Sequence, residues 1–382
     1  MAGGSRGCVT LRGAQIRDLL DAKHNVLFDC DGVIWNGEAA VPGAPEVVSL
    51  LKQRGKRVFF VTNNCTRPRD NYVQKFARLG FTDVAEEEIF SSAYCSAAYL
   101  RDVARLRGKV YVIGGGGVRK ELEDAGVPTV EEETERDRGV SITDCPLDPE
   151  VKAVLVGYDE GFTFMKLAKA CCYLQDTECL FLATDPDPWH PLRGGRVTPD
   201  HGGLLMLTLV EGSPGCQQVT QLVYLQQSGR HPLLTRTKTF QNTMQDQFEG
   251  MIYFITLLKG VLLELTVQVH SGSQGSGSLT AALETASSRK ATVIGKPGRF
   301  MFDCISSQFG LDPARSLMVG DRLETDVCFG STCDLATVLT LTGVSTQEEA
   351  LRYRDSPEPE HHSCVPDFIV ESVGDFLQAL EE

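Results

Sequence analysis

The chain has 382 residues, of which 42% are hydrophobic and 23% charged, and its formal net charge is −14. This length accommodates two domains or one large α/β domain with an insertion, and the acidic balance argues against nucleic acid as the main partner. Thirteen cysteines, an odd number without a Cys-x-x-Cys pair, argue against a zinc site or a disulfide framework. Reduced thiols in a cytosolic protein are expected, and the first thirteen residues lack a secretion signal.

A short apolar run at 26–28 predicts a buried strand, and it leads into Asp29, Asp31 and Gly32. A turn at Gly32 would bring both acids to the mouth of one site. Two anions this close repel unless a cation or a phosphate-binding network balances them. The tripeptide alone is equally compatible with a solvated turn at the end of a strand.

Strands and helices then alternate along the chain. The second apolar strand ends in Thr62, Asn63 and Asn64. Helices are expected at 11–22, 45–54, 71–79 and 91–106, and the second strand at 57–62. Strand, helix and strand at this spacing predict a parallel sheet with helices on its faces.

The pattern restarts near Lys109 and predicts a second α/β domain. Its elements are strands at 110–113, 153–158 and 179–184, and helices ending at 125 and spanning 164–174. The glycine run 114–117 does not have the Gly-x-Gly-x-x-Gly spacing, which favours a turn over a dinucleotide site. A Pro-rich loop containing His190 follows the last strand.

Residues 200–274 differ from the rest, because they are rich in Gln, Thr and Ser and show no strand–helix alternation. A long segment without readable elements is more often a disordered insertion than part of a compact domain. The apolar stretch 251–269 is interrupted by Lys259 and Glu264, so no membrane span is expected.

Regular elements return after this segment. Ser278 is expected to cap a helix over 279–286. Strands at 291–294 and 316–319 are followed by Lys296 and Asp321, and a helix lies between them at 300–309. Strands at 336–341 and 368–370 complete the expected sheet.

Four apolar strands therefore each end in polar side chains. Ligands of an open parallel sheet sit at the carboxyl ends of its strands, so these side chains can converge although they are far apart in the sequence. Three carboxylates suit a hard divalent cation such as Mg²⁺, and a hydroxyl, amides and a lysine suit phosphate oxygens. A carboxylate nucleophile can then form an aspartyl phosphate.

These segments resemble the four motifs of the haloacid dehalogenase (HAD) phosphatase superfamily. They are Asp29-Cys-Asp-Gly-Val33, Thr62-Asn-Asn64, Gly295-Lys-Pro297 and Gly320-Asp-Arg-Leu-Glu-Thr-Asp326. The resemblance narrows to the pyridoxal phosphate phosphatases and the related phosphoglycolate and glycerol-3-phosphate phosphatases. It implies a Rossmann-like parallel-sheet core, residues 1–106 and 291–382, with an inserted α/β cap domain, residues 107–290.

The resemblance also implies a role for each motif residue. Asp29 would be the nucleophile and Asp31 the general acid and base. The Asp29 carboxylate, the Asp31 backbone carbonyl and Asp321 would hold Mg²⁺, with Asp326 behind them. The phosphate-binding residues would be Thr62, Asn63, Asn64 and Lys296.

Within the cap, the loop 185–191 is similar to the substrate loop of the pyridoxal phosphatases, which makes His190 a substrate-binding residue. Tyr158 is a second candidate to line the site. A histidine between prolines is otherwise a common surface feature. The resemblance further implies a cytosolic homodimer joined through the cap, acting on a small phosphorylated substrate and possibly on phosphoserine of a phosphoprotein.

The insertion 200–274 is the departure from the family pattern, which runs directly from a Thr-Pro to a Gly-x-Gly-Ser-Leu. It lies within the cap, so cap folding, substrate choice and dimerisation are in question. An alternative of another class is therefore a catalytically silent binding protein with a disrupted cap. Intact acids at all four motifs favour the enzyme.

Overall fold

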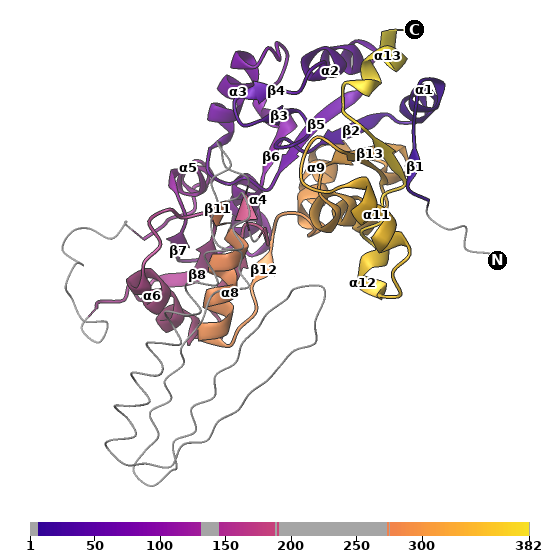
Figure 1. The fold of residues 1–382 in the computed structure, drawn as a ribbon. Coiled ribbons are helices and arrows are strands. Elements are labelled where there is room, and N and C mark those ends of the chain that lie inside the picture. The colour runs from indigo at the N-terminus through magenta and orange to yellow at the C-terminus, as the bar shows by residue number, and fades with distance from the viewer. Residues whose placement is uncertain (1–6, 131–144, 188, 191–272, 275, 382) are drawn as a thin grey trace. The chain divides into compact units, whose positions relative to one another are not determined.

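A computed structural model describes residues 7–130, 145–187, 189–190, 273–274 and 276–381. The chain divides into two compact units, residues 1–187 with 276–382, and residues 188–275. Both large sheets belong to the first unit (Figure 1). Nearly all of the predicted insertion 200–274 lies outside the described residues, and so does the apolar stretch 251–269.

The larger sheet has seven strands, all paired in parallel. In sheet order they are β1 (Val9–Thr10), β15 (Phe368–Val370), β14 (Ala336–Thr340), β13 (Ser316–Gly320), β2 (Asn25–Phe28), β5 (Arg57–Thr62) and β6 (Ile89–Ser91). The expected parallel α/β fold is confirmed. Strand β2 lies between β13 and β5, so three of the expected strand ends are neighbours.

Helices bury both faces of this sheet, as parallel sheets require. The helices of this part of the chain are α1 (Ala14–Asp21), α2 (Ala44–Gln53), α3 (Arg69–Arg78), α4 (Ser92–Ala98), α9 (Phe300–Phe309), α10 (Cys328–Thr332), α11 (Gln347–Arg354), α12 (Pro359–His362) and α13 (Asp375–Glu381). Phe28 packs in one core cluster with residues of α1, α2 and α13, whereas its neighbour Leu27 packs in another with residues of α4 and α9. This alternation follows from the period of two along a strand.

Short elements complete this part of the chain. The π-helical turn η8 (Leu323–Val327) follows β13, and η2 (Tyr99–Val103) extends α4. The remaining ones are a hairpin of β3 (Trp35–Asn36) and β4 (Ala39–Ala40), and the 3₁₀ turns η1 (Glu86–Glu88) and η7 (Pro313–Arg315). The helix expected to reach residue 106 thus ends at Val103.

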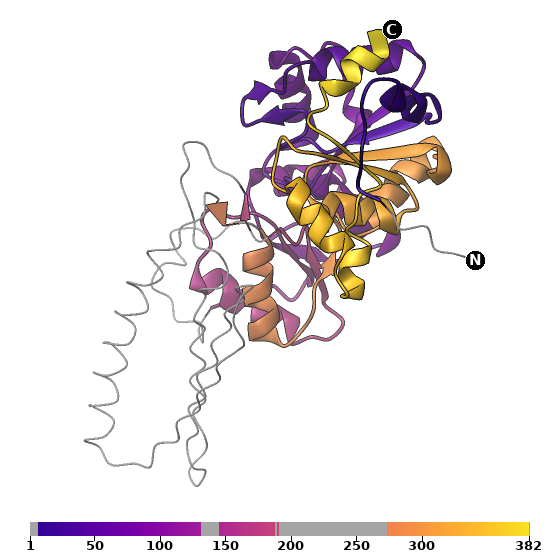
Figure 2. The ribbon, with the colours of Figure 1, turned by 45° about the vertical axis from the view of Figure 1, so that its right-hand side comes forward.

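The second sheet has four parallel strands in the order β12 (Thr292–Val293), β9 (Leu180–Ala183), β8 (Val151–Val156) and β7 (Lys109–Ile113). Its helices are α5 (Gly116–Asp124), α6 (Phe164–Leu174) and α8 (Ser276–Ser287). Figures 1 and 2 show α6 and α8 next to each other, and residues of both share one core cluster with β8.

Two expectations about this region are wrong. The strand before Lys296 does not join the larger sheet, because Thr292 and Val293 pair in register with Leu182 and Ala183 of β9. Ser278 does not precede its helix, which already begins at Ser276. The predicted domain limits at 106 and 290 stay predictions. Strand β12 follows residue 290 in the sequence, but it pairs with a strand of the predicted cap domain.

The described residues on either side of 191–272 are paired with each other. Strand β10 (Trp189–His190) pairs antiparallel with β11 (Ser273–Gln274), so the last two residues of the predicted insertion are paired. In the first unit, Ser276 Oγ donates to Asp185 Oδ2 at 2.6 Å and Gly277 N donates to the Asp187 carbonyl at 2.9 Å.

In the described part of the chain, no helix combines the length and apolarity that a membrane crossing needs.

Deletion of residues 200–272, joining Pro199 to Ser273, is expected to leave both sheets folded. The pairing at the base is retained, and loop length contributes only about 0.6 kcal/mol per doubling. Thermal unfolding followed by circular dichroism should give a cooperative transition at or above the wild-type temperature. Loss of that transition would show that the deleted segment is integral to the fold.

Candidate active site

Asp29 follows β2 at the carboxyl edge of the larger sheet. Its backbone N–H donates to the Val319 carbonyl of β13 at 2.9 Å, which continues the parallel ladder by one residue. The side chain is buried. Because β13 and β5 flank β2, Asp29 lies between the ends of the strands that lead to Asp321 and to Thr62.

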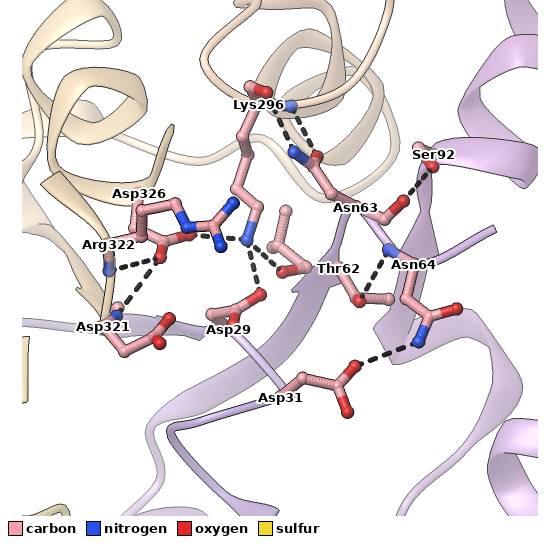
Figure 3. Close-up of polar contacts among 12 residues, drawn as sticks. Asp29, Asp31, Thr62, Asn63, Asn64, Ser92, Lys296, Asp321, Arg322 and Asp326 are labelled. Atoms are coloured by element: carbon pink, nitrogen blue, oxygen red, sulfur yellow. Dashed lines mark hydrogen bonds and ion pairs between the residues drawn. The ribbon is translucent and has the colours of Figure 1, made fainter. Parts of the chain in front are cut away.

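Lys296 joins Asp29 to Asp326 through its ammonium group (Figure 3). Lys296 Nζ lies 2.5 Å from Asp29 Oδ1, 2.6 Å from Asp326 Oδ1 and 2.9 Å from the Val61 carbonyl. The lysine is only 2% exposed. All three of its N–H donors are therefore engaged by protein oxygens, as a buried ammonium requires.

Asp326 and Asp321 are held by backbone amides. Asp326 Oδ2 accepts from the N–H groups of Asp321 and Arg322 at 3.2 and 3.1 Å, and Asp321 Oδ2 accepts from Val344 N at 2.8 Å. Asp326 lies in the π-helical turn η8, a type of irregularity common at functional sites. Both Asp326 oxygens are thus already occupied, which leaves Asp29 and Asp321 more available to an ion.

The backbone around Asp321 is shaped by two glycines. A Cβ at Gly32 or Gly343 would overlap the Asp321 carboxylate. Gly32 also has a φ of 89°, which strains any other residue. These positions therefore need glycine for the carboxylate to lie where it does.

The acids form one buried cluster. One carboxylate oxygen from each of Asp29, Asp321 and Asp326 lies within 4.8 Å of the other two. Burial raises the pKa of Asp29 well above its usual value, against the opposing effect of Lys296, and the other two acids raise it further. Burial and the Asp326 charge raise the pKa of Asp321 to about 7. These acids repel one another, and an oxygen-rich donor set of this kind fits a hard divalent cation.

Lys296 keeps its charge in this environment. Burial alone lowers its pKa, but the Asp29 and Asp326 carboxylates outweigh that effect and raise the pKa above the ordinary lysine value. The cation thus compensates part of the negative charge of the cluster.

Asp31 lies in a different environment, directly before the turn that the sequence predicts at Gly32. Its Oδ1 accepts from Trp35 Nε1 at 2.9 Å and its Oδ2 from Asn64 Nδ2 at 3.2 Å. Its side chain is 39% exposed, unlike that of Asp29, and Lys75 Nζ lies 3.9 Å from Oδ1. Two acids separated by one residue thus have separate partners. No sequence pattern predicted the contact with Lys75.

The segment after β5 interacts mainly with other motif residues. Thr62 Oγ1 accepts from Asn64 N at 3.1 Å. Asn63 Oδ1 accepts from Lys296 N at 2.8 Å, and its Nδ2 donates to the Lys296 carbonyl at 2.9 Å. The Asn63 side chain therefore fixes the backbone of Lys296. Phosphate binding by Thr62, Asn63 and Asn64 stays a prediction.

Two residues of this network, the buried Asp187 and the half-buried Arg322, had no predicted role. Asp187 Oδ1 lies 2.7 Å from Arg322 Nη1, and its Oδ2 accepts from Asn63 Nδ2 at 3.0 Å. Both Asp187 and Arg322 lie within segments that the resemblance singles out. Within those segments, no sequence pattern marks Asp187 or Arg322, and only the contact between their side chains in the structure shows their role.

The two predicted cap residues are not tested by these contacts. His190 lies in β10, but its side chain falls outside the described part of the chain. Tyr158 is half-buried, donates from its backbone N to Cys65 Sγ at 3.3 Å and from its hydroxyl to Glu160 Oε1 at 3.2 Å. Both assignments stay predictions.

Comparison with known proteins places the chain in a family. Residues 26–128 match the family of haloacid dehalogenase-like hydrolases, and residues 293–376 match a family described as HAD-hydrolase-like. Chronophin of Homo sapiens is 42% identical over 381 residues, an alignment that covers 98% of this chain and 99% of chronophin. The chain belongs to the haloacid dehalogenase-like hydrolases.

Within that family it is a phosphoric monoester hydrolase, so the alternative of a silent binding protein is set aside. The glycerol-3-phosphate phosphatase of Gallus gallus is 37% identical over 385 residues, covering 100% of this chain and 99% of that enzyme. Glycerol phosphate phosphatase from Mycobacterium tuberculosis, solved in complex with magnesium, shares the fold with a TM-score of 0.61 at 20% identity, covering 96% of this chain and 78% of that one.

Replacing Lys296 with Met is expected to destabilise the protein by about 3–5 kcal/mol at neutral pH, because it leaves buried carboxylates uncompensated. Urea unfolding measures this free energy against wild type.

The loss should be smaller at pH 5 than at pH 8. Without the cation the folded-state pKa of Asp29, which burial already raises, rises further above its unfolded value, so the folded variant binds more protons and loses stability as pH rises. The wild-type Lys296 contribution is constant over this range, since its folded pKa is raised above 10.5. A loss that grew on acidification would contradict this charge assignment.

Proposed function

We propose that the protein is a Mg²⁺-dependent phosphatase that hydrolyses small phosphomonoesters through an aspartyl phosphate on Asp29, with pyridoxal 5′-phosphate as its main substrate. The observation that carries the proposal is the contrast between two acids one residue apart. Asp29 is buried against Lys296, while Asp31 is partly exposed and hydrogen-bonded to Trp35 and Asn64. Such pairs of unlike environments separate a nucleophile from an acid–base group.

In the first chemical step, an Asp29 carboxylate oxygen attacks phosphorus and the bond to the leaving oxygen breaks. Asp31 donates its proton to that oxygen, so the alcohol leaves neutral. In the second step, water attacks the phosphoaspartate and Asp31 takes the proton from it. Inorganic phosphate leaves and the Asp29 carboxylate is restored.

The donor set supports Mg²⁺. The Asp29 carboxylate, the Asp31 backbone carbonyl and Asp321 would hold the ion, while Asp326 orients Lys296 and the backbone of Asp321. When bound, the ion neutralises charge on the phosphoryl oxygens. Lys296 contributes a second positive charge beside Asp29, and Thr62, Asn63 and Asn64 lie at the adjacent strand end to bind phosphate oxygens.

The substrate assignment rests on the loop that contains His190 and on the similarity to chronophin. Glycerol 3-phosphate or phosphoglycolate is the second candidate, favoured by the similarity to the Gallus gallus enzyme. Phosphoserine on a protein is a further candidate. We also propose a cytosolic homodimer joined through the cap domain.

A screen over these phosphomonoesters and p-nitrophenyl phosphate tests the proposal, run with Mg²⁺ and with EDTA. Turnover should require Mg²⁺, and kcat/KM should be highest for pyridoxal 5′-phosphate. A higher value for glycerol 3-phosphate would select the second candidate. No Mg²⁺-dependent turnover of any of them would refute the proposed function.

Asp29→Asn should abolish turnover and the formation of an acid-stable, base-labile phosphoenzyme. Asp31→Asn should keep the fold but lower kcat by about a hundredfold or more, since a general acid–base is lost. Phosphoenzyme trapping after acid quench separates the two variants. Wild-type activity in Asp29→Asn would show that another group is the nucleophile.

His190→Ala should raise KM for pyridoxal 5′-phosphate more than KM for p-nitrophenyl phosphate, because only the former offers a pyridine ring to hydrogen-bond. Steady-state kinetics on both substrates give the comparison. Equal changes on the two substrates would assign His190 to loop structure instead of recognition.

A further inference from the structure

Asp187 contacts two of the four motifs directly. Its carboxylate accepts from Asn63 Nδ2 at 3.0 Å on one oxygen and pairs with Arg322 Nη1 at 2.7 Å on the other. It is 5% exposed although it belongs to none of the four motifs. These contacts join the loop after β9 to the segments that follow β5 and β13.

Both partners of Asp187 in turn hold catalytic groups. The Asn63 side chain binds the backbone N–H and C=O of Lys296, whose ammonium contacts Asp29. The Arg322 backbone N–H donates to Asp326, which contacts the same ammonium group. Displacement of either partner would therefore shift the Lys296 ammonium group away from its position beside Asp29.

The position requires a carboxylate for a chemical reason. Asn63 Nδ2 and Arg322 Nη1 are both donors, and only a carboxylate offers an acceptor to each. An amide at position 187 would turn its oxygen to the charged guanidinium, because charged donors form the stronger hydrogen bonds. Its NH₂ group would then face the Asn63 NH₂ group, with no acceptor between them.

The Asp187 main chain is itself fixed on both sides. Its N–H donates to Asp185 Oδ1 at 3.1 Å, and its carbonyl accepts from Gly277 N at 2.9 Å. Asp185 is fully buried and also accepts from Thr184 and Ser276. A side chain on such a fixed backbone can position its partners instead of following them.

We propose that Asp187 is a positioning residue of the phosphatase, holding Asn63 and Arg322 so that Lys296 stays aligned with Asp29. The expected effect of Asp187 on catalysis rests on the proposed function, whereas its effect on the position of the Lys296 backbone does not. Since Lys296 faces the phosphoryl group common to all substrates, the effect is independent of the leaving group. This distinguishes Asp187 from His190, which lies three residues further along the chain.

The kinetic experiment compares Asp187→Asn and Asp187→Ala with wild type. Both should lower kcat about tenfold or more on p-nitrophenyl phosphate and on pyridoxal 5′-phosphate alike, as small misplacements of catalytic groups cost up to about a hundredfold. Wild-type kcat in both variants would overturn the proposal, and so would a loss confined to pyridoxal 5′-phosphate.

Hydrogen exchange at the Lys296 amide gives a readout that needs no activity. That N–H donates to Asn63 Oδ1, so release of Asn63 should speed its exchange by about tenfold or more in both variants. Unchanged exchange would overturn the proposal even if activity fell. If exchange at Lys296 were faster in the folded Asp187 variants while the wild-type protein hydrolysed none of the phosphomonoesters, only the proposed function would be refuted.

Asp367→Asn is the matched control. Asp367 Oδ2 also accepts from two donors, Thr337 N and Oγ1, at 3.0 and 3.1 Å, but at the amino ends of β14 and β15, the opposite edge of the sheet. It should lower stability without changing kcat or exchange at Lys296. Equal effects from this control would mean that the changes at Asp187 report general destabilisation.

The double variant Asp187→Asn with Arg322→Met isolates the contact. Without the guanidinium, the introduced amide can turn its oxygen to Asn63, so exchange at Lys296 should slow toward the wild-type rate relative to Asp187→Asn alone. Purely additive effects of the two substitutions on that exchange rate would contradict the two-donor mechanism.

Discussion

The site depends on one buried cation. Lys296 lies among Asp29, Asp326 and a backbone carbonyl, and because it is buried, leaving its charge unpaired would cost several kcal/mol. The acids depend on it equally, since burial and mutual repulsion raise the pKa of Asp29 and Asp321. One lysine and three acids still leave a net negative charge, which is why the cluster fits an added divalent cation.

This charge balance is built from distant parts of the chain. Asp29 and Lys296 are separated by 267 positions, and they follow strands of different sheets. The seven-stranded sheet supplies the acids, because β2 lies beside β13. The four-stranded sheet supplies the lysine after β12. Asn63 connects the two by holding the Lys296 backbone, so the segment after β5 has a structural task besides any contact with phosphate.

The contrast between Asp29 and Asp31 arises where the chain leaves strand β2 and enters a turn directly after Asp31. Gly32 adopts a positive φ, and the chain folds back so that its N–H reaches the Trp35 carbonyl. Asp29 remains at the end of a buried strand, while Asp31 faces Trp35, Asn64 and Lys75. Two acids that are almost adjacent in sequence thus lie in different environments, one at the end of a buried strand and one beside the turn that begins at Gly32.

Much of this was determined by the sequence alone. Apolar runs ending in Asp29, Thr62 and Asp321 predict parallel strands and a shared edge, because burial on both faces of such a sheet requires continuous apolar strands. The sequence predicts helices at 164–174 and 300–309, and these are the bounds of α6 and α9 in the structure. Their apolar spacing is local information.

Tertiary structure alone decided the rest. Which sheet a two-residue strand such as β12 joins depends on the partner that reaches it, and β9 does. Similarly, Asp187, Arg322 and Lys75 acquire their partners from distant segments, so no local pattern marks them. Contacts between residues far apart in the sequence depend on how the packed helices and strands are arranged in space. A single sequence gives the residue types but not that arrangement.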